Sequence, residues 1–429
     1  MSGMIIGAAT PTLVRTWSGK KSPDDFAVVY SGARAMYQHE DIYVATQGMY
    51  IYSPFLAFIF QPLAAMPQRA ASLTWTILSA LIFAGSAVFG AAKVSSSWQS
   101  HLSNVDAVPS SVIAAGAVLL SLSKIRSDFT LGQTDCLIIA GLIASLMCFN
   151  RRPILAAAVI GVTANFKYLA LIFIPYFVIK RNYRAALTAI VSFLFFFALP
   201  SVEVGFGLLK TYANRALAVI ARVIGLQAMM PNHADKPIVN SVVWNHSISV
   251  TSTIFRVTRS HGISDLVAGI LIVSLFVLLA GSLIFVGRAH GVNLFHSKNT
   301  TPADERAVTI EWATLIVLAL AFGPQTTARH MIMLLPVFMV GIAIFLIQGR
   351  ALWRIVLLTL MVAVSVTLLF PFRDTGVHPI LISLKSIGIA SWCAIGLMFA
   401  IVWTGSRAIS TDGTYSSAEI PIPEANDPD

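Results

Sequence analysis

The chain has 429 residues, of which 56% are hydrophobic and 11% are charged, and its formal net charge is +10. Soluble globular proteins carry about 25% charged residues, so the composition excludes an ordinary soluble protein and predicts an all-α polytopic membrane protein. Because Lys and Arg mostly set topology in such proteins, the basic charge does not indicate nucleic-acid binding. We expect membrane lipids as partners and no nucleic acid.

The N-terminal part is expected to precede the first membrane span. Met4–Val14 is too short and too weakly apolar for a span, and no signal peptide with a cleavage site is evident. Either the true start lies upstream, or the chain lacks a first membrane helix. After the polar stretch Lys21–Tyr43, the segments YIYSPF (Tyr50–Phe55) and QPLAAMP (Gln61–Pro67) carry prolines and aromatic residues. They predict helices that lie along the membrane interface.

Nine apolar runs predict membrane helices, within a total of about 9–11 membrane segments. They lie at about 70–92, 107–123, 134–149, 185–200, 262–287, 308–322, 330–347, 352–370 and 378–403. We interpret residues 1–403 as one transmembrane domain. The Ser/Thr/Pro-rich residues 404–429 predict a disordered cytoplasmic tail.

Four basic segments set the orientation of these helices. They are Asn150–Pro153, Lys180–Arg184, Gly287–Lys298 and Gln348–Arg354. If all four face the cytoplasm, the other connections alternate to the outer side of the membrane. The outer connections are then residues 1–69, the long loop 201–261, and short loops near 124–133, 323–329 and 371–377.

Residues 153–180 are apolar but have basic segments at both ends, so a single span would place one of those segments outside. Lys167 lies between two apolar stretches of about fourteen residues, each short for a span. We expect a re-entrant pair of half-length helices with Lys167 at the turn, where a buried charge would mark function. The alternative is one long tilted helix with a snorkelling lysine.

Polar residues on the predicted outer face fall in three further segments. KIRSDFTLGQTD (Lys124–Asp135) leads into an apolar helix, where Asp135 would also serve as a helix cap. NSVVWNHSISVTSTIFR (Asn240–Arg256) carries side chains common in sugar sites, although a solvated loop would look similar. FGPQTTARHMIMLLP (Phe322–Pro336) places Arg329 and His330 at the start of a span, either as an interface anchor or as an anion site.

These segments resemble the polyprenol-phosphate-sugar-dependent glycosyltransferases of the GT-C superfamily, and within it glycosyltransferase family 87. The resemblance runs from about residue 24 to 336 and is carried by the order and spacing of several motifs. Three features depart from the family pattern: the absence of a full helix before the Asp-containing loop, Asp135 in place of Asn, and His246 in place of Gln. The motifs are DFAVVYSGARAM, DIY, YIYSPFLAFIFQPLAAMP, LGQTDCLI, ANFKYLALIFIPYFVIKRNYRAA, NHS with Arg256 downstream, and RHMIMLLP.

The resemblance implies an inverting sugar transfer on the outer face of the plasma membrane, from a polyprenyl-phosphate-linked donor to a lipid or glycan acceptor. Mannose is the first candidate for the sugar. Asp25 aligns with the family's catalytic base, and Asp24 is its rival. The expected ligands of the donor phosphate are Lys167, Arg126, Arg256 and Arg329. The expected contacts of the sugar or acceptor are Asp24, Tyr52, Gln133, Asp135, Asn245, His246 and His330.

No metal site and no cofactor are expected, because no cluster of carboxylates and histidines fits a dedicated metal cage. The three cysteines, Cys136, Cys148 and Cys393, fall in apolar runs without paired spacing. Two other functions stay open: a transporter or lipid flippase, and a non-catalytic assembly factor. The enzyme interpretation requires Asp25 and Lys167 to line one outward-facing cavity; the others do not.

Overall fold

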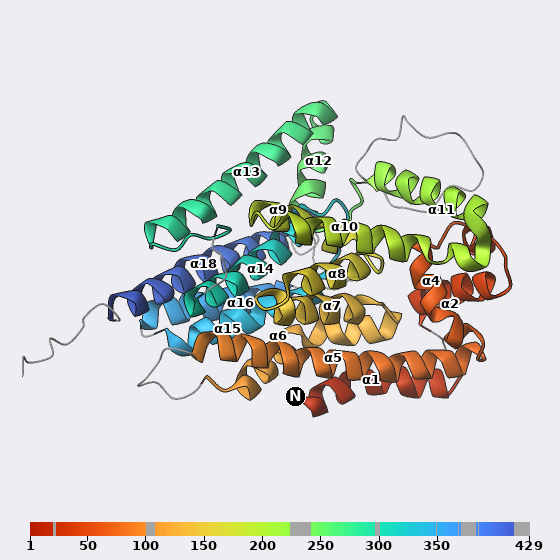
Figure 1. Ribbon diagram of the computed structural model, residues 1–429, viewed down its shortest axis with the longest axis horizontal. Coiled ribbons are helices and arrows are strands. Elements are labelled where there is room, and N and C mark those ends of the chain that lie inside the picture. The colour runs from red at the N-terminus through yellow and green to blue at the C-terminus, as the bar shows by residue number, and fades with distance from the viewer. Residues whose placement is uncertain are drawn as a thin grey trace, which may run out of the picture.

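A computed structural model describes residues 1–19, 23–99, 108–223, 242–296, 301–348, 350–367, 369, 383, 384 and 386–415. The described chain is all-α, as the composition predicted. Figure 1 shows most of the long helices lying side by side, with α2, α4 and α11 at the right-hand end of the view and α13 slanting away at the upper left. The helices are α1 (Ser2–Trp17), α2 (Asp24–Tyr37), α3 (Ile42–Ala45), α4 (Pro54–Ala64), α5 (Gln68–Gln99), α6 (Ser110–Leu131), α7 (Asp135–Phe149), α8 (Pro153–Ala164), η1 (Tyr168–Ile172), α9 (Phe173–Ile179), α10 (Tyr183–Ala198), α11 (Ser201–Val223), α12 (Val250–Ser260), α13 (Asp265–Ala289), α14 (Pro302–Phe322), η3 (His330–Leu334), α15 (Leu335–Ile347), α16 (Ala351–Thr367) and α18 (Ile389–Tyr415).

Within the described ranges, four segments are long and apolar enough to cross a membrane: α5, α13, His330–Ile347 and Ile389–Ser410. The pair α10 and α11 counts as a fifth if it is one span, although the two helices meet at 101°. In the described part of the chain, each of the nine predicted runs overlaps a helix. Fewer helices are long and apolar enough to cross a membrane than the nine predicted, because several of the nine are shorter than the roughly 20 residues that a span needs.

Four boundaries differ from the sequence prediction. Helix α1 precedes the Asp-containing loop and packs along α5 and α6, so tertiary contacts stabilise a segment that its weak apolarity did not predict. Helix α6 continues through the predicted loop 124–133 to Leu131, because Ile125, Asp128 and Phe129 repeat at helical spacing on its buried face. The predicted long loop 201–261 contains α11 and α12.

The fourth difference concerns the predicted disordered tail from residue 404. Helix α18 continues to Tyr415 and packs against α14, and its Thr404 and Ser406 are buried. At Gly405, an added Cβ would come within 2.6 Å of Ile310, so the two helices are in close contact there. Residues 416–429 of the predicted tail, and the predicted loop 371–377, lie outside the described residues.

The segment 153–180 forms the predicted hairpin. Helix α8 ends at Ala164, Lys167 has an extended backbone, and η1 and α9 return toward the starting end. The return is evident because Phe149, just before α8, has its ring 5.6 Å from that of Tyr176 and 5.9 Å from that of Phe177 in α9. Lys167 therefore lies at the turn, and a single long tilted helix is excluded.

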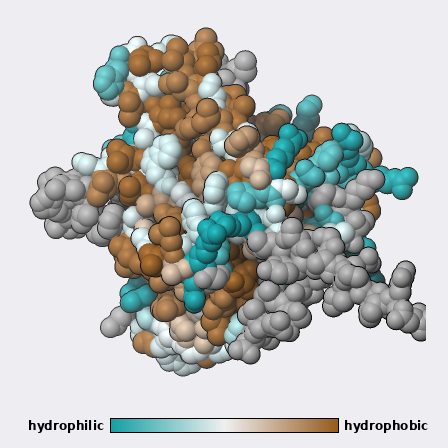
Figure 2. Space-filling view, turned by 90° about the vertical axis from the view of Figure 1, so that its left-hand side faces the viewer, coloured by the Kyte–Doolittle hydropathy of each residue, from teal (hydrophilic) through white to brown (hydrophobic). Residues whose placement is uncertain are grey.

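The described residues of the four basic segments lie together at one end of the bundle, as the topology prediction requires. Glu311 in α14 binds Lys180 at 3.0 Å and also accepts from the backbone of Phe295. The ring of Trp403 lies 4.8 Å from His290 and 5.8 Å from Trp353. Figure 2 looks onto the left-hand end of Figure 1 and shows hydrophilic side chains gathered over its middle, with hydrophobic side chains around them.

Candidate active site

A cavity of about 300 Å³ lies where six separate parts of the chain meet. They are the start of α2, the segment 49–53, the turn after α6, the hairpin turn at 164–168, and a wall formed by Trp244 with residues 325–330. Asp25 and Lys167 both line it, as the enzyme interpretation requires. Its lining includes Asp25, Val28, Tyr52, Ser53, Gln133, Asn165, Phe166, Lys167, Tyr168, Trp244, Gln325, Thr327, Arg329 and His330.

Asp25 is placed by close packing between the start of α2 and the end of α6. Gly132 ends α6 with a left-handed backbone (φ 67°), and an added Cβ would come within 2.5 Å of Phe26. Only glycine fits such a close approach at positive φ without strain. The turn therefore brings Gln133 against Asp25, whose carboxylate accepts hydrogen bonds from Gln133 and, at 2.7 Å, from Arg329.

The environment of Asp25 suits a proton acceptor. Burial raises the pKa of this carboxyl above its usual value, while the positive charges of Arg329 and then Lys167 oppose that rise. The neighbouring carboxylates Asp24 and Asp135 raise the pKa further. A carboxylate with a raised pKa is a stronger base than an exposed one.

Lys167 forms an ion pair with Asp135, the first residue of α7. The Asp135 carboxyl is fully buried, whereas 18% of the Lys167 side chain is exposed to the cavity. Gln133 joins the two ion pairs, because its carbonyl accepts from Lys167 at 3.4 Å while its amide donates to Asp25. The site therefore holds two carboxylates and two cations in one connected network.

A third carboxylate lies deeper in the protein behind this network. Asp128, on the buried face of α6, is 4% exposed, and neither of its oxygens has a hydrogen-bond partner among the described residues. It is close enough to interact electrostatically with Asp135, Lys167 and Asp25. Asp128 was not among the predicted site residues, because residues 124–133 were predicted to form an external loop.

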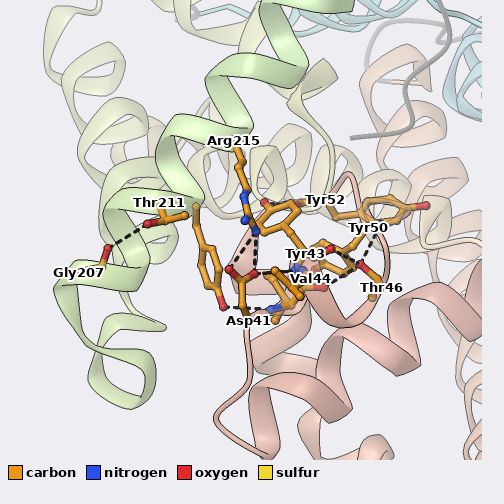
Figure 3. A network of polar contacts seen from close by, with 11 residues as sticks. Asp41, Tyr43, Val44, Thr46, Tyr50, Tyr52, Gly207, Thr211 and Arg215 are labelled. Carbon is orange, nitrogen blue, oxygen red and sulfur yellow. Dashed lines mark hydrogen bonds and ion pairs between the residues drawn. The ribbon is translucent and has the colours of Figure 1, made fainter. Parts of the chain in front are cut away.

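Figure 3 shows the network that anchors the segment before Tyr52 to α11. Asp41 caps α3 and binds Arg215 of α11 at 2.8 and 3.0 Å. Arg215 also lies over the ring of Tyr43, at 5.3 Å, and the Tyr43 hydroxyl donates to the carbonyl of Tyr52 at 3.2 Å. A chain of contacts therefore runs from α11 to the cavity wall at Tyr52.

The next residue, Ser53, connects that wall to the hairpin turn. Its hydroxyl donates to the side chain of Asn165 at 3.2 Å, and Asn165 in turn donates to the carbonyls of Gly161 and Phe193, both at 3.1 Å. Asn165 and Ser53 are almost fully buried. These bonds hold the turn at which Lys167 enters the cavity.

The cavity wall that contains Trp244 is built from two segments about 80 residues apart in the chain. Ser247 and Thr327 form an isolated antiparallel bridge, and the Ile248 amide donates to the carbonyl of Thr326 at 2.8 Å. The Ser252 hydroxyl donates to Ser247 at 2.7 Å and to the carbonyl of Pro324 at 2.8 Å. Ser247 and Ser252 therefore crosslink the two segments.

Arg256, predicted to bind phosphate, instead holds this wall. Its guanidinium donates to the carbonyls of Trp244 (2.9 Å) and Ser247 (3.1 Å), to the Thr253 hydroxyl (3.1 Å), and to the carbonyl of Ser386. Because of these bonds, the Arg256 guanidinium points toward the backbone rather than into the cavity.

Of the predicted site residues, six line the cavity and Asp135 supports Lys167 from behind. The six are Asp25, Tyr52, Gln133, Lys167, Arg329 and His330. Five others do not line it: Arg126 and Asn245 are exposed, His246 contacts the ring of Trp244, Arg256 binds backbone, and Asp24 lines a separate small pocket with Thr12 and Arg15.

Six further lining residues whose side chains carry a polar group were not among the predicted site residues. They are Ser53, Asn165, Tyr168, Trp244, Gln325 and Thr327, and of these Ser53 has mainly the structural contact described above. All stand inside or next to motifs that the sequence analysis quoted, so adjacency to a motif was the available signal. Among the described residues, no group of three or more His, Cys, Asp and Glu side chains is arranged to hold a metal ion.

Comparison with known proteins shows two similarities. The model of glycosyltransferase family 87 matches residues 50–297, which includes the hairpin turn and the Trp244 segment but neither Asp25 nor Arg329. A polyprenol-phosphate-mannose-dependent alpha-(1-2)-phosphatidylinositol mannoside mannosyltransferase of Mycobacterium tuberculosis (strain ATCC 25618 / H37Rv) is 27% identical. The alignment covers 39% of this chain and 42% of that protein, less than half of its length. No solved structure matches the chain.

Proposed function

The chain belongs to glycosyltransferase family 87, and from this premise we propose that it is an inverting, polyprenyl-phosphate-sugar-dependent glycosyltransferase. The proposed donor carries mannose, as the name of the mycobacterial relative suggests, and the proposed acceptor is a lipid or glycan. The apolar helices support a multi-pass membrane location. We further propose the plasma membrane, with the cavity facing the periplasm or exterior.

The observation that carries this proposal is the pairing of one carboxylate with two cations in a single cavity. Asp25 is in contact with Arg329 at 2.7 Å, and Lys167 is connected to it through Gln133. Glycosyl transfer from a lipid phosphate requires a base for the acceptor hydroxyl and positive charge for the leaving phosphate. This arrangement supplies both groups from residues that the family pattern and the fold bring together.

In the proposed reaction, the acceptor oxygen attacks the anomeric carbon as Asp25 takes the proton of the acceptor hydroxyl. The bond between the anomeric carbon and the phosphate oxygen breaks on the opposite face, so the configuration inverts. The bonding electrons leave with the lipid phosphate, which gains one negative charge. Asp25 becomes neutral in the same step.

That exchange of charge gives Arg329 a specific task. Before transfer its guanidinium neutralises Asp25, at 2.7 Å. Once Asp25 is protonated, the attraction between them falls and the guanidinium is available to the phosphate, which has just gained charge. Lys167 keeps a buried partner in Asp135 throughout, so we assign it to positioning the donor phosphate before the reaction.

The test is transfer by the purified protein in lipid vesicles, with polyprenyl-phosphate-linked mannose, glucose and arabinose offered in turn. Transfer from one of these donors, with inversion at the anomeric carbon, supports the proposal. Transfer from none of them, with flipping or transport of the lipid-linked sugar instead, would favour the transporter interpretation. An excess of chelator in one arm tests the expected independence from metal ions, because loss of transfer there would contradict it.

A further inference from the structure

The cavity wall that contains Trp244 combines an aromatic ring with polar groups that have no hydrogen-bond partner among the described residues. Trp244 lines the cavity, and its backbone is held in place by the Arg256 guanidinium and by the Ser247 amide, which donates to the Trp244 carbonyl at 3.0 Å. The ring of His246 packs against the Trp244 ring at 5.1 Å. Trp244 is therefore a fixed side chain at the surface of the cavity.

Two polar side chains on the same wall each have a polar atom without a hydrogen-bond partner in the described part of the chain. The Thr327 hydroxyl and the Gln325 amide nitrogen are buried without a hydrogen-bond partner among the described residues, and Thr327 is only 3% exposed. Each such group costs about 1–3 kcal/mol if it stays unpaired. Rotation of either side chain about its own bonds would turn the polar group toward the cavity, because both residues line it. A ligand with hydroxyl groups would restore the missing hydrogen bonds.

His330 adds a third polar group to this wall. The backbone amide of Thr327 donates to His330 Nδ1 at 3.2 Å, so the ring proton is on Nε2 and available as a donor. His330 also lines the cavity. Its neighbour in sequence, Arg329, is the residue that binds Asp25, which places the wall next to the proposed base.

We propose that Trp244, Gln325 and Thr327 form a pyranose-binding platform, on which one face of a neutral sugar ring stacks on the indole while its hydroxyls bind the two polar side chains. The inference rests on the proposed function. It assigns a role to Trp244, in the segment whose side chains are common in sugar sites, and to Gln325 and Thr327, which were not among the predicted site residues. An aromatic surface with a few convergent polar groups is the usual composition of a site for a small organic ligand. Among the described residues of this wall that line the cavity, the only cation is Arg329, which is paired with Asp25, so the platform suits a sugar rather than a phosphate.

Arg256 is the positioning residue of this platform. It does not line the cavity, but its bonds to the carbonyls of Trp244 and Ser247 set the backbone from which the indole projects. Loss of the guanidinium should therefore affect the reaction only through Trp244. Two residues that act through one another give non-additive effects in a double-mutant cycle.

The experiment measures kcat and the KM of donor and acceptor separately in membrane vesicles. Trp244→Ala should raise one of the two KM values about tenfold or more with a smaller change in kcat, and Trp244→Phe, which keeps an aromatic face, should raise it less. Thr327→Val should raise the same KM. The substrate whose KM rises identifies the ring on the platform as the donor sugar or the acceptor sugar. Trp353→Ala is the matched control, because Trp353 packs on Trp403 at the other end of the bundle.

Arg256→Met should raise the same KM as Trp244→Ala, Arg256→Lys should raise it less, and the double variant Trp244→Ala/Arg256→Met should match Trp244→Ala alone. Unchanged KM values in an active Trp244→Ala enzyme would overturn the platform. Purely additive effects of the Trp244 and Arg256 changes on KM would overturn the positioning role of Arg256.

A binding readout separates failure of the platform from failure of the proposed function. Methyl mannoside should quench the Trp244 fluorescence, measured as the difference between wild type and Trp244→Phe. Quenching in a protein that transfers no sugar would keep the platform and reject the proposed reaction. Sugar transfer with no quenching and unchanged KM values would reject the platform alone.

Discussion

The guanidinium of Arg329 and the carboxylate of Asp25 are 2.7 Å apart, although 304 positions separate the two residues in the chain. Both side chains are about 30% exposed, so the pair stays accessible from the cavity. A partly exposed pair of this kind contributes little to stability. Its significance is chemical, because the guanidinium opposes the rise that burial causes in the pKa of Asp25.

Asp25→Asn should lower kcat about 10²- to 10⁴-fold, since the amide cannot accept the acceptor's proton. Asp24→Asn is the matched control, because Asp24 precedes it in α2 but lines a different pocket. Initial rates of sugar transfer, with protein folding checked by thermal unfolding in detergent, measure both variants. Equal losses in the two variants would remove Asp25 from the role of base.

Arg329→Gln should move the acid limb of the pH–rate profile to higher pH. Burial raises the pKa of Asp25, and Arg329 is the largest influence that opposes the rise. Without Arg329 the pKa of Asp25 rises further, so the carboxylate that acts as base is lost at a higher pH as the solution is acidified. The profile of kcat/KM reports this pKa in the free enzyme.

Arg126→Gln provides the control for this shift, because Arg126 is an exposed cation on α6 that does not line the cavity. Its acid limb should coincide with that of wild type. An unmoved acid limb in Arg329→Gln, or an equal shift in both variants, would contradict the assignment of the limb to Asp25.

The pair of Lys167 and Asp135 allows structural and catalytic roles to be separated. Lys167→Met leaves the fully buried Asp135 carboxylate without its partner, which should destabilise the protein by about 3 kcal/mol and also raise the donor KM. In Lys167→Met/Asp135→Asn the buried charge is gone, so the midpoint of thermal unfolding should recover most of its loss while the donor KM stays raised. Recovery of the KM together with stability would show that Lys167 has only a structural role.

Arg215→Met tests whether α11 supports the cavity from a distance. The half-buried ion pair with Asp41 and the contact with the Tyr43 ring should together contribute about 1–2 kcal/mol, and their loss should loosen the wall at Tyr52. We expect a lower unfolding midpoint and a modest rise in KM with kcat largely kept. Lys210→Met, at an exposed position of the same helix, should change neither. Equal unfolding midpoints and KM values in the two variants would show that α11 does not support the cavity.

Much of the architecture could be predicted from local sequence. The apolar runs predicted the helices, and the basic segments at both ends of residues 153–180 predicted a hairpin with Lys167 at its turn. These predictions succeeded because hydrophobic length and the placement of Lys and Arg act locally on each segment. Helix ends were less predictable: charged residues obscured the helical periodicity of α6, and α1 depends on packing against α5 and α6.

The candidate site was only partly predictable, because a motif shows which residues occur together but not where each side chain points. Asp25, Lys167 and Arg329 meet in the cavity as the motifs suggested. Arg256 stands in an equally plausible motif, yet its guanidinium is taken up by backbone carbonyls. Trp244, its neighbour in that motif, lines the cavity in its place.

By itself, the sequence determined the membrane class, most of the helices and the segments from which the site is drawn, since these follow from apolarity and charge along the chain. Only the tertiary structure decided which side chains share the cavity. The pairing of Asp25 with Arg329 depends on the tight turn at Gly132, and the Trp244 wall depends on hydrogen bonds between segments 80 residues apart. Such contacts form between distant segments, so no local pattern of residues specifies them.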